Sequence, residues 1–288
     1  MQLDVKKRIY FLAICGTAMA SLAAMMKVKG YEVYGSDEGV YPPMSDFLAE
    51  QGIVAFEGFD AAHLHPRPDL VIVGNVISRG NVEIEEILDQ HIPYMSLPEA
   101  LREFLIRGNR SIVVTGTHGK TTTSSMLSWL FESANRKPSF MIGGIPKNFG
   151  RGFQLGAGED FILEGDEYDS AYFDKAAKFL RYLPDIAIIN GIEFDHADIY
   201  SSLDDIKLAF QRFVNLIPGK GFLAVNGEDA NAVEISKRAF CPVVTFGVSE
   251  NVDWRAVDIE TTSESTQFIA LHRGVEWARI SIPFPGEH

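Results

Sequence analysis

The stretch Val113–Thr123, VVTGTHGKTTT, decides the fold of the longer part of the chain. Ser111–Thr115 is a short apolar run typical of a buried strand, and a turn containing Gly116 and Gly119 follows it directly. Lys-Thr then opens a predicted helix that runs to about residue 134. Successive backbone N–H groups in such a loop, together with the positive end of the helix, can bind phosphate oxygens.

In this arrangement Lys120 neutralises charge on the β- and γ-phosphates of ATP, and the Thr121 hydroxyl reaches Mg²⁺. The general phosphate-loop pattern also has a glycine where this chain has Val114, so a chance glycine-rich turn is the alternative. The strand–loop–helix context favours a phosphate site. The predicted phosphate-binding residues are Gly116, Thr117, His118, Gly119, Lys120, Thr121 and Thr122.

Two acidic clusters follow predicted strands further along the chain. Glu164–Asp169 comes after FIL, and Glu193–Asp198 comes after IAIIN. Open α/β sheets place their sites at the carboxyl ends of strands, and Mg²⁺ prefers hard oxygen ligands. Solvated loop ends are the alternative for each cluster alone. Beside a phosphate loop, we expect one carboxylate from each strand end at the metal, with His196 as a metal ligand or a hydrogen-bonding group.

The N-terminal part carries a second strand–glycine–helix pattern. Arg8–Cys15 predicts a buried strand, Thr17–Lys29 a helix, and Gly35-Ser36-Asp37 the end of the next strand. An acidic residue about twenty positions after a glycine turn is typical of ribose binding. Only Gly16 of the three dinucleotide-fingerprint glycines is present, which disfavours a nicotinamide site. A different nucleotide diphosphate and a purely structural turn remain as interpretations.

Strands and helices alternate along most of the chain, which predicts an α/β fold with parallel sheets. Arg107-Gly108-Asn109 separates two such alternations. We expect a Rossmann-like parallel-sheet domain over residues 1–108 and a P-loop ATPase-like central domain over residues 109–288. After Asp253 the pattern changes to short alternating strands.

Composition excludes several classes of protein. The chain has 288 residues, with 26 basic and 39 acidic side chains and a net charge of −13. An acidic balance disfavours nucleic-acid and anionic-membrane partners, which require a basic surface. The two cysteines give no disulfide framework, and no apolar run approaches a membrane span. We expect a cytoplasmic protein with small-molecule substrates.

Taken together, these segments resemble the Mur ligases, ATP-dependent enzymes that join amino acids or peptides to a UDP-linked muramyl sugar. The residues that carry the resemblance are Gly16–Met19, Gly116–Thr123, Glu164–Glu167 and Asn190–His196 (NGIEFDH). The resemblance implies ATP and Mg²⁺ as cofactors and Lys120, Glu164 and His196 as catalytic residues. It also implies Thr121, Glu164 and His196 as metal-site residues. The UDP-sugar-binding residues that it implies are Gly16, Thr17, Ala18, Met19, Ser36, Asp37, Asn75 and Ser78.

Within the family, several stretches are most similar to the murein peptide ligases, which join L-alanyl-γ-D-glutamyl-meso-diaminopimelate to UDP-N-acetylmuramate. They are Ser36–Leu48, Gly74-Asn75 with Ser78–Asn81, Asp166–Phe179 and Glu193–Tyr200. The L-alanine-adding ligases lack the extended segment between Asp169 and Pro184. An L-alanine-adding ligase, or a nucleotide-binding module without ligase activity, is the alternative. Folylpolyglutamate synthetase shares the central-domain pattern but not the front domain.

Two departures from the family pattern affect what we expect. Gly165 stands where the family motif Glu-Ala-Asp-Glu has alanine, which is a mild change. Family members continue past the equivalent of Gly286-Glu287-His288 into an asparagine that contacts adenine and into a third domain. We therefore expect this chain to be a fragment with an incomplete central domain, able to bind a UDP-sugar but weakly active or inactive as a ligase.

Overall fold

The computed structural model describes residues 7–195 and 199–286. Its contacts divide the chain into two compact units. Unit 1 comprises Met1–Asn109 and Leu127–Tyr182, and unit 2 comprises Arg110–Met126 and Leu183–His288. Each unit combines a parallel sheet with helices, so the predicted α/β fold class is confirmed. No helix within the described residues combines the length and apolarity needed to cross a membrane.

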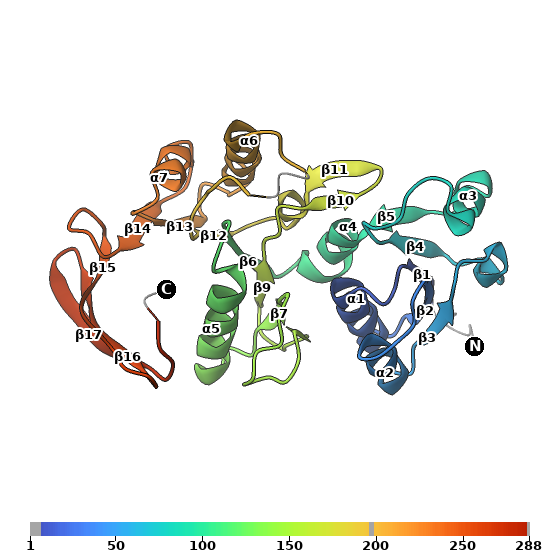
Figure 1. Ribbon diagram of the computed structural model, residues 1–288, viewed down its shortest axis with the longest axis horizontal. Helices are drawn as coiled ribbons and strands as arrows, with labels where there is room; N and C mark the ends of the chain where they lie inside the picture. The colour runs from blue at the N-terminus through green and yellow to red at the C-terminus, as the bar shows by residue number, and fades with distance from the viewer. Residues whose placement is uncertain (1–6, 196–198, 287–288) are drawn as a thin grey trace. The chain divides into compact units, whose positions relative to one another are not determined.

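Unit 1 contains a five-stranded parallel sheet in the order β3-β2-β1-β4-β5 (Figure 1). Its strands are β1 (Arg8–Leu12), β2 (Glu32–Asp37), β3 (Val54–Glu57), β4 (Leu70–Val73) and β5 (Tyr94–Ser96). Its helices are α1 (Thr17–Val28), α2 (Met44–Glu50), α3 (Val82–Asp89) and α4 (Leu97–Leu101), with 3-10 turn Ala61–Leu64 and π-helix Arg102–Ile106. The central strands are apolar because parallel strands are buried on both faces.

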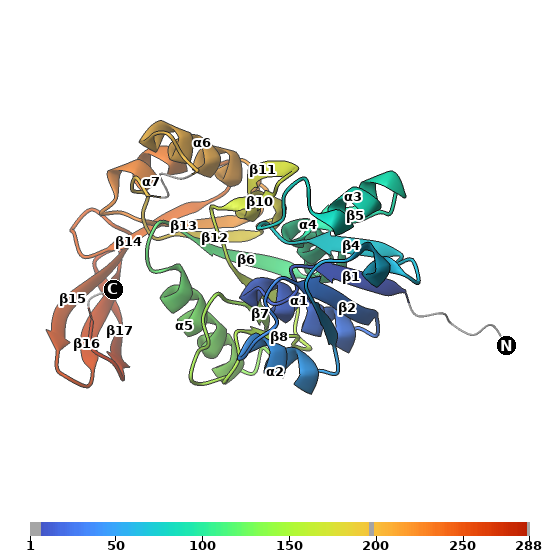
Figure 2. The same cartoon turned by 45° about the vertical axis from the view of Figure 1, so that its right-hand side comes forward.

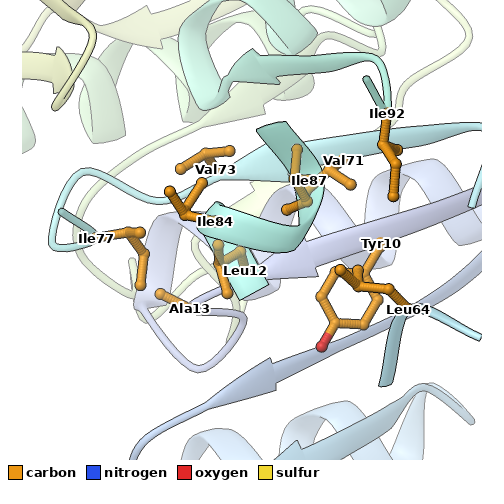
Figure 3. Close-up of a cluster of buried hydrophobic side chains, with 10 residues drawn as sticks. All are labelled: Tyr10, Leu12, Ala13, Leu64, Val71, Val73, Ile77, Ile84, Ile87 and Ile92. Atoms are coloured by element: carbon orange, nitrogen blue, oxygen red, sulfur yellow. The ribbon is translucent and has the colours of Figure 1, made fainter. Parts of the chain in front are cut away.

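The two faces of this sheet carry different helices. Tyr10 and Leu12 of β1 belong to a buried cluster with Ile84 and Ile87 of α3, as Figure 3 shows. Side chains alternate along a strand, so Ile9 and Phe11 point to the opposite face. Helix α1 lacks a polar face over most of its length, since every residue from Met19 to Met26 is buried.

The remainder of unit 1 comes from residues 127–182. Strand β7 (Ser139–Met141) pairs in parallel with β9 (Asp160–Glu164) and antiparallel with β8 (Phe153–Gln154). A hairpin of β10 (Asp169–Ala171) and β11 (Asp174–Ala177) follows, then the 3-10 turn Lys178–Arg181. The sequence predicted the strand that ends before the Glu164 cluster, which is β9, but not the hairpin, because its strands have only three and four residues.

Unit 2 contains the strand order β6-β12-β13-β14-β15-β16-β17, of which β6 to β15 pair in parallel and β15 to β17 form an antiparallel meander (Figure 2). Its strands are β6 (Arg110–Thr115), β12 (Ile186–Ile189), β13 (Phe222–Asn226), β14 (Val243–Gly247), β15 (Trp254–Thr261), β16 (Thr266–His272) and β17 (Val275–Ile282). Helix α5 (Lys120–Ser133) begins in this unit.

Two further helices complete unit 2, α6 (Leu203–Val214) and α7 (Ala230–Ser236). Helix α6 is amphipathic, and the Ser202 hydroxyl caps it by accepting the Asp205 N–H at 3.2 Å. Helix α7 begins after Asp229, whose carboxylate accepts the Ala232 N–H at 2.6 Å. The sequence predicted β6, the strand before the Glu193 cluster, which is β12, and the short strands after Asp253, but α7 is too short to show a clear helical period.

Candidate nucleotide-binding sites

A cavity of about 420 Å³ lies in unit 1 beyond the carboxyl ends of β1, β2 and β4. This is the place where open α/β sheets bind nucleotides. The turn after β1 forms one wall, and the loops after β2 and β4 form the others. The lining residues are Ala13, Cys15, Gly16, Thr17, Met19, Asp37, Gly39, Tyr41, Pro43, Met44, Gly74, Asn75 and Val76. They include five predicted UDP-sugar residues: Gly16, Thr17, Met19, Asp37 and Asn75.

Asp37 joins two walls of this cavity. Its Oδ2 atom accepts the Cys15 N–H at 2.8 Å, and its Oδ1 atom accepts the Gly39 N–H at 3.4 Å. The carboxylate also lines the cavity, where its oxygens can accept hydrogen bonds from sugar hydroxyls. Asp37 can therefore hold the loop after β1 and contact a ligand at the same time.

The Cys15 thiol lies in the same wall and is half-buried. Burial, and then the nearby Asp37 carboxylate, raise the pKa of the Cys15 thiol to about 11. Both causes oppose the thiolate, because a negative charge loses hydration there and meets a second negative charge. The thiol is therefore neutral at physiological pH and behaves as a weak hydrogen-bonding group in the wall.

Ser36 differs from its neighbour Asp37, because its side chain is fully buried on the α3 face of the sheet. Its hydroxyl donates a hydrogen bond to Glu83 Oε2 at 2.6 Å. Glu83 of α3 is also fully buried and accepts from the Tyr10 hydroxyl at 3.0 Å. Alternation along β2 places Ser36 beside Leu12 and beneath α3, away from the cavity wall. The structure therefore places the Ser36 side chain in the core network around Glu83.

Ala18 and Ser78, also predicted to bind the UDP-sugar, do not belong to the cavity lining. Ala18 is exposed in the first turn of α1, and Ser78 is exposed in the loop that joins β4 to α3. Next to Ser78, Arg79 forms a bidentate ion pair with Glu85 at 2.8–2.9 Å. This pair fixes the loop at the point where it enters α3.

The phosphate loop of unit 2 joins β6 to α5, as predicted. Gly116 has φ +130° and Gly119 has φ +76°, both in the region that favours glycine. A Cβ atom on Gly116 would lie 2.9 Å from the backbone nitrogen and oxygen of Gly191. The loop can therefore pass Gly191 at this distance only because Gly116 carries no side chain.

Hydrogen bonds to the segment after β12 fix the path of the phosphate loop. The Thr117 N–H donates to the Gly191 carbonyl at 2.9 Å, and the Thr117 hydroxyl accepts the Glu193 N–H at 2.9 Å. The Asn190 side-chain amide donates to the Thr123 hydroxyl at 3.1 Å and to the His118 carbonyl at 3.3 Å. The loop is thus shaped by contacts within unit 2 before any ligand binds.

Lys120 is the first residue of α5, and its side chain turns back over the loop. Its ammonium donates to the Gly116 carbonyl at 2.7 Å and to the Thr117 carbonyl at 3.2 Å. This geometry places a positive charge beside the backbone that would surround phosphates. His118 is exposed and lies 3.8 Å from Glu193. Thr121 and Thr122 are exposed in the first turn of α5.

The predicted metal-site residues do not all lie in one unit of the described structure. Glu164 ends β9 in unit 1, where its Oε2 atom accepts the Gly143 N–H at 2.8 Å. Thr121 belongs to unit 2, and His196 lies outside the described residues. Across residues 7–195 and 199–286, no group of three or more His, Cys, Asp and Glu side chains could hold a metal ion. The metal site therefore stays a prediction.

Two family profiles match consecutive parts of the chain. The profile for the Mur ligase family, catalytic domain, matches residues 8–108, and that for the Mur ligase middle domain matches residues 114–288. This chain belongs to the Mur ligase family. The predicted family is confirmed, while the predicted boundary at residues 108 and 109 stays a prediction because the compact units divide the chain along a different line.

Individual Mur ligases show where the chain stands within the family. It is 42% identical to UDP-N-acetylmuramate–L-alanyl-γ-D-glutamyl-meso-2,6-diaminoheptandioate ligase of Escherichia coli, over 98% of this chain and 61% of that protein. It is 33% identical to UDP-N-acetylmuramate–L-alanine ligase of a Geobacter species, over 98% and 59%. The chain thus spans about three fifths of the length of these relatives.

A solved Mur ligase structure resembles the computed one closely. The crystal structure of UDP-N-acetylmuramate:L-alanyl-γ-D-glutamyl-meso-diaminopimelate ligase from Neisseria meningitides matches with a TM-score of 0.91 and 38% identity. The match covers 98% of this chain and 89% of that one. A murein peptide ligase from Psychrobacter arcticus matches with a TM-score of 0.87 and 34% identity, over 98% of this chain and 62% of that one.

Sequence reasoning missed several residues that shape the two sites of this Mur ligase. In unit 1 they are Ala13, Gly39, Tyr41, Pro43, Met44, Gly74 and Val76 of the cavity lining, and Glu83, which binds the Ser36 hydroxyl. In unit 2 they are Asn226, Asp229 and Asn231, which hold the segment after β12. The dipeptide Pro42-Pro43 beside a glycine-containing loop was a usable signal for the cavity wall. The partners of buried polar groups carried no local signal.

Proposed function

We propose that this chain supplies the UDP-sugar-binding and ATP-binding parts of a ligase that joins L-alanyl-γ-D-glutamyl-meso-diaminopimelate to UDP-N-acetylmuramate. The observation that carries the proposal is the phosphate loop Gly116–Lys120, whose backbone path requires glycine at Gly116 and whose lysine lies over it. The second strand–glycine–helix loop, at Gly16, lines a separate cavity in unit 1. Two nucleotides in one chain are what a UDP-sugar and ATP require.

The proposed reaction has two steps, activation of the muramyl carboxylate and attack by the peptide amine. A carboxylate oxygen of the muramyl group attacks the γ-phosphorus of ATP, the bond to the β-phosphate oxygen breaks, and ADP leaves. The peptide amine then attacks the carbonyl carbon of the acyl phosphate, loses a proton, and expels phosphate as the amide forms. This chemistry depends on positioning and on charge stabilisation more than on a protein nucleophile.

The chain's residues fit these tasks. The N–H groups of residues 116–122 and the start of α5 would bind the β- and γ-phosphates, and Lys120 would neutralise their charge. Gly16 and Thr17 would approach the UDP pyrophosphate at the start of α1, with Asp37 and Asn75 in the same cavity. The Thr121 hydroxyl and the Glu164 carboxylate have the oxygen chemistry that Mg²⁺ prefers, and His196 stays a predicted metal-site residue outside the described residues. Mg²⁺ would screen the phosphates when bound.

The choice of peptide as the second substrate rests on two observations. Identity is higher to the tripeptide-adding relative, 42% against 33% for the L-alanine-adding one. The hairpin β10–β11 lies in the segment between Asp169 and Pro184, which the resemblance assigns to the peptide-adding ligases and not to the L-alanine-adding ones, and its turn carries the aromatic rings of Tyr172 and Phe173. The Phe173 ring lies 5.0 Å from Tyr94 and 5.1 Å from Tyr172 in edge-on geometry. The resemblance to murein peptide ligases implies a role in cell-wall recycling, so we propose a cytoplasmic protein of peptidoglycan recycling.

Binding measurements on the chain test the proposal. Calorimetric titration is expected to show binding of UDP-N-acetylmuramate and of ATP with Mg²⁺. A thermal-shift measurement is expected to show no stabilisation by NADH. Lys120→Ala should weaken ATP binding by about 100-fold, because charge-assisted contacts to phosphate are lost. It should leave UDP-N-acetylmuramate binding unchanged.

Lys220→Ala is the matched control, because it removes the same charge from an exposed turn of unit 2. It should change neither affinity. Loss of both ligands in Lys120→Ala would contradict two separate sites, and stabilisation by NADH alone would refute the proposed substrate class. ADP release that depends on L-alanine, with none on the tripeptide, would assign the chain to the L-alanine-adding ligases.

A further inference from the structure

The segment Asn190–Glu193 is the surface against which the phosphate loop is shaped. Its first residue donates its N–H to the Thr115 carbonyl at 3.0 Å, and its second accepts the Thr117 N–H at 2.9 Å. Its last residue donates its N–H to the Thr117 hydroxyl at 2.9 Å. A displacement of this segment must therefore move the loop's hydrogen-bond partners.

Steric contact adds to these hydrogen bonds. A Cβ atom on Gly116 would lie 2.9 Å from Gly191, and one on Gly119 would lie 3.0 Å from the Asn190 side-chain nitrogen. The first distance is shorter than real Cβ contacts, so the backbones of Gly116 and Gly191 touch directly; the second, to a side chain, is tighter than most Cβ contacts. Packed groups at this distance transmit a shift, because no side chain can adjust between them.

The opposite side of the same segment is held by the turn between β13 and α7. Asn226 donates its side-chain amide to the Asn190 carbonyl at 2.8 Å. The Ile192 N–H donates to Asp229 Oδ2 at 3.2 Å, and the Ile192 carbonyl accepts from the Asn231 amide at 2.8 Å. Two side chains at the start of α7 thus hold both backbone polar groups of one buried residue.

Asp229 also ties this contact to the helix itself. Its second oxygen, Oδ1, accepts the Ala232 N–H at 2.6 Å and caps α7. The Ile192 backbone is therefore fastened to the rigid start of a helix and not to a free loop. Both hydrogen-bonding directions at Ile192 are satisfied within unit 2.

We propose that Asp229 and Asn231 are positioning residues for ATP binding, which set the phosphate loop through Ile192 and Gly191. The inference rests on the proposed function and assigns its nucleotide affinity partly to a helix start that carries no phosphate-loop residue. When the two side chains no longer hold Ile192, the segment relaxes and Thr117 loses its partners. The loop's N–H groups then bind phosphate less well.

Two variants separate positioning from helix capping. Asn231→Asp keeps the shape of the side chain but sets a carboxylate oxygen against the Ile192 carbonyl, and it leaves the α7 cap intact. Asp229→Ser keeps an oxygen for the Ala232 N–H but is too short to reach Ile192 as well. Each is expected to raise the Kd for ATP with Mg²⁺ by about 10-fold, as the loss of one hydrogen bond to a positioned group predicts.

The control variant is Ser202→Ala, which removes the cap of α6 without touching this segment. It should lower stability comparably and leave the ATP Kd unchanged. Hydrogen-exchange mass spectrometry supplies the signature of positioning: peptides covering residues 116–120 and 190–194 should exchange faster in both test variants and not in Ser202→Ala. Because both variants act through Ile192, the Kd for ATP should rise in the double variant by less than the product of the two single fold-changes.

The outcomes are distinguishable. Wild-type ATP affinity in Asp229→Ser and Asn231→Asp, with the exchange of residues 190–194 accelerated or not, would overturn the inference and leave the proposed function standing. Equal losses of ATP and UDP-N-acetylmuramate binding would mean general unfolding and would also overturn it. Failure of the unaltered chain to bind ATP would overturn the proposed function and this inference together.

Discussion

The loops at Gly16 and Gly116 share one local arrangement, in which a buried strand is followed by a glycine and a helix. The two glycines differ in backbone conformation and in how closely other atoms approach them. Gly116 has φ +130°, and a Cβ atom there would lie 2.9 Å from Gly191. Gly16 has φ −62°, which any residue can adopt, and a Cβ atom there would meet nothing closer than 3.8 Å. The fold requires glycine at Gly116 but not at Gly16.

This difference shows how far contacts within the protein determine the shape of each loop. The phosphate loop is enclosed by the segment Asn190–Glu193, so its shape is set by contacts within unit 2. The loop at Gly16 is open toward a cavity and is held mainly by Asp37 behind it. We propose that the absence of a side chain at Gly16 allows the close approach of a ligand, whereas its absence at Gly116 allows the close approach of the protein's own backbone.

The largest predicted effect comes from placing the same methyl group at each position. Gly116→Ala should lower the free energy of unfolding by at least about 3 kcal/mol and abolish ATP binding, because both the backbone conformation and the Gly191 contact oppose it. Gly16→Ala should cost less than about 1 kcal/mol, since only the helix N-cap changes. It should weaken UDP-N-acetylmuramate binding. Urea unfolding and calorimetric titration measure both quantities.

The comparison between the loops would be wrong if the two variants lost similar stability. It would also be wrong in its assignment of ligands if Gly16→Ala left UDP-N-acetylmuramate affinity unchanged. Gly30→Ala serves as a reference for backbone strain alone, since Gly30 has φ +96° and a Cβ atom there would meet nothing within 4 Å. Its destabilisation should fall between the other two.

Contiguous patterns were predictable from the sequence, and contacts between distant residues were not. The strand, glycines, lysine and helix of the phosphate loop occupy eleven consecutive residues, Val113–Thr123, and the structure arranges them as predicted. The side chains that hold Ile192 lie some forty positions further on, in a turn whose composition is ordinary. Strands β3 and β5 were missed because VAFE and YMS are short and only partly buried.

Glu83 shows the same limit within unit 1. It belongs to VEIEEILD, where four acidic residues in a helix indicate a solvated face. The structure buries one of them, because the Ser36 and Tyr10 hydroxyls and the Asp60 N–H all donate to it. Burial of a carboxylate requires such donors, and they come from elements that sequence periodicity does not connect. The resemblance that implied Ser36 as a UDP-sugar-binding residue does not show these contacts.

The Ser36 side chain gives a prediction of intermediate size. Ser36→Ala should lower the free energy of unfolding by about 2 kcal/mol, because a buried carboxylate loses one of its donors. UDP-N-acetylmuramate affinity should stay the same, since the Ser36 side chain does not line the cavity. Ser78→Ala is the matched control: this exposed serine should change stability by no more than about 0.5 kcal/mol. A selective loss of UDP-N-acetylmuramate affinity in Ser36→Ala would restore Ser36 as a ligand contact.

The smallest effect tests how open the Gly16 loop is, through the reactivity of Cys15. With its pKa raised to about 11, this thiol is mostly protonated at pH 8. The smaller thiolate fraction outweighs the greater nucleophilicity of a more basic thiolate, so alkylation should be about 10-fold slower than for an ordinary thiol. The rate should rise with pH until about pH 11, and Asp37→Asn should raise it at pH 8 by removing the adjacent negative charge. Peptide mass spectrometry separates Cys15 from the buried Cys241, and UDP-N-acetylmuramate should protect Cys15 if the ligand fills this cavity. Alkylation that levels off near pH 8.5 would contradict the raised pKa of the Cys15 thiol. Alkylation that proceeds equally fast with UDP-N-acetylmuramate present would contradict a ligand in this cavity.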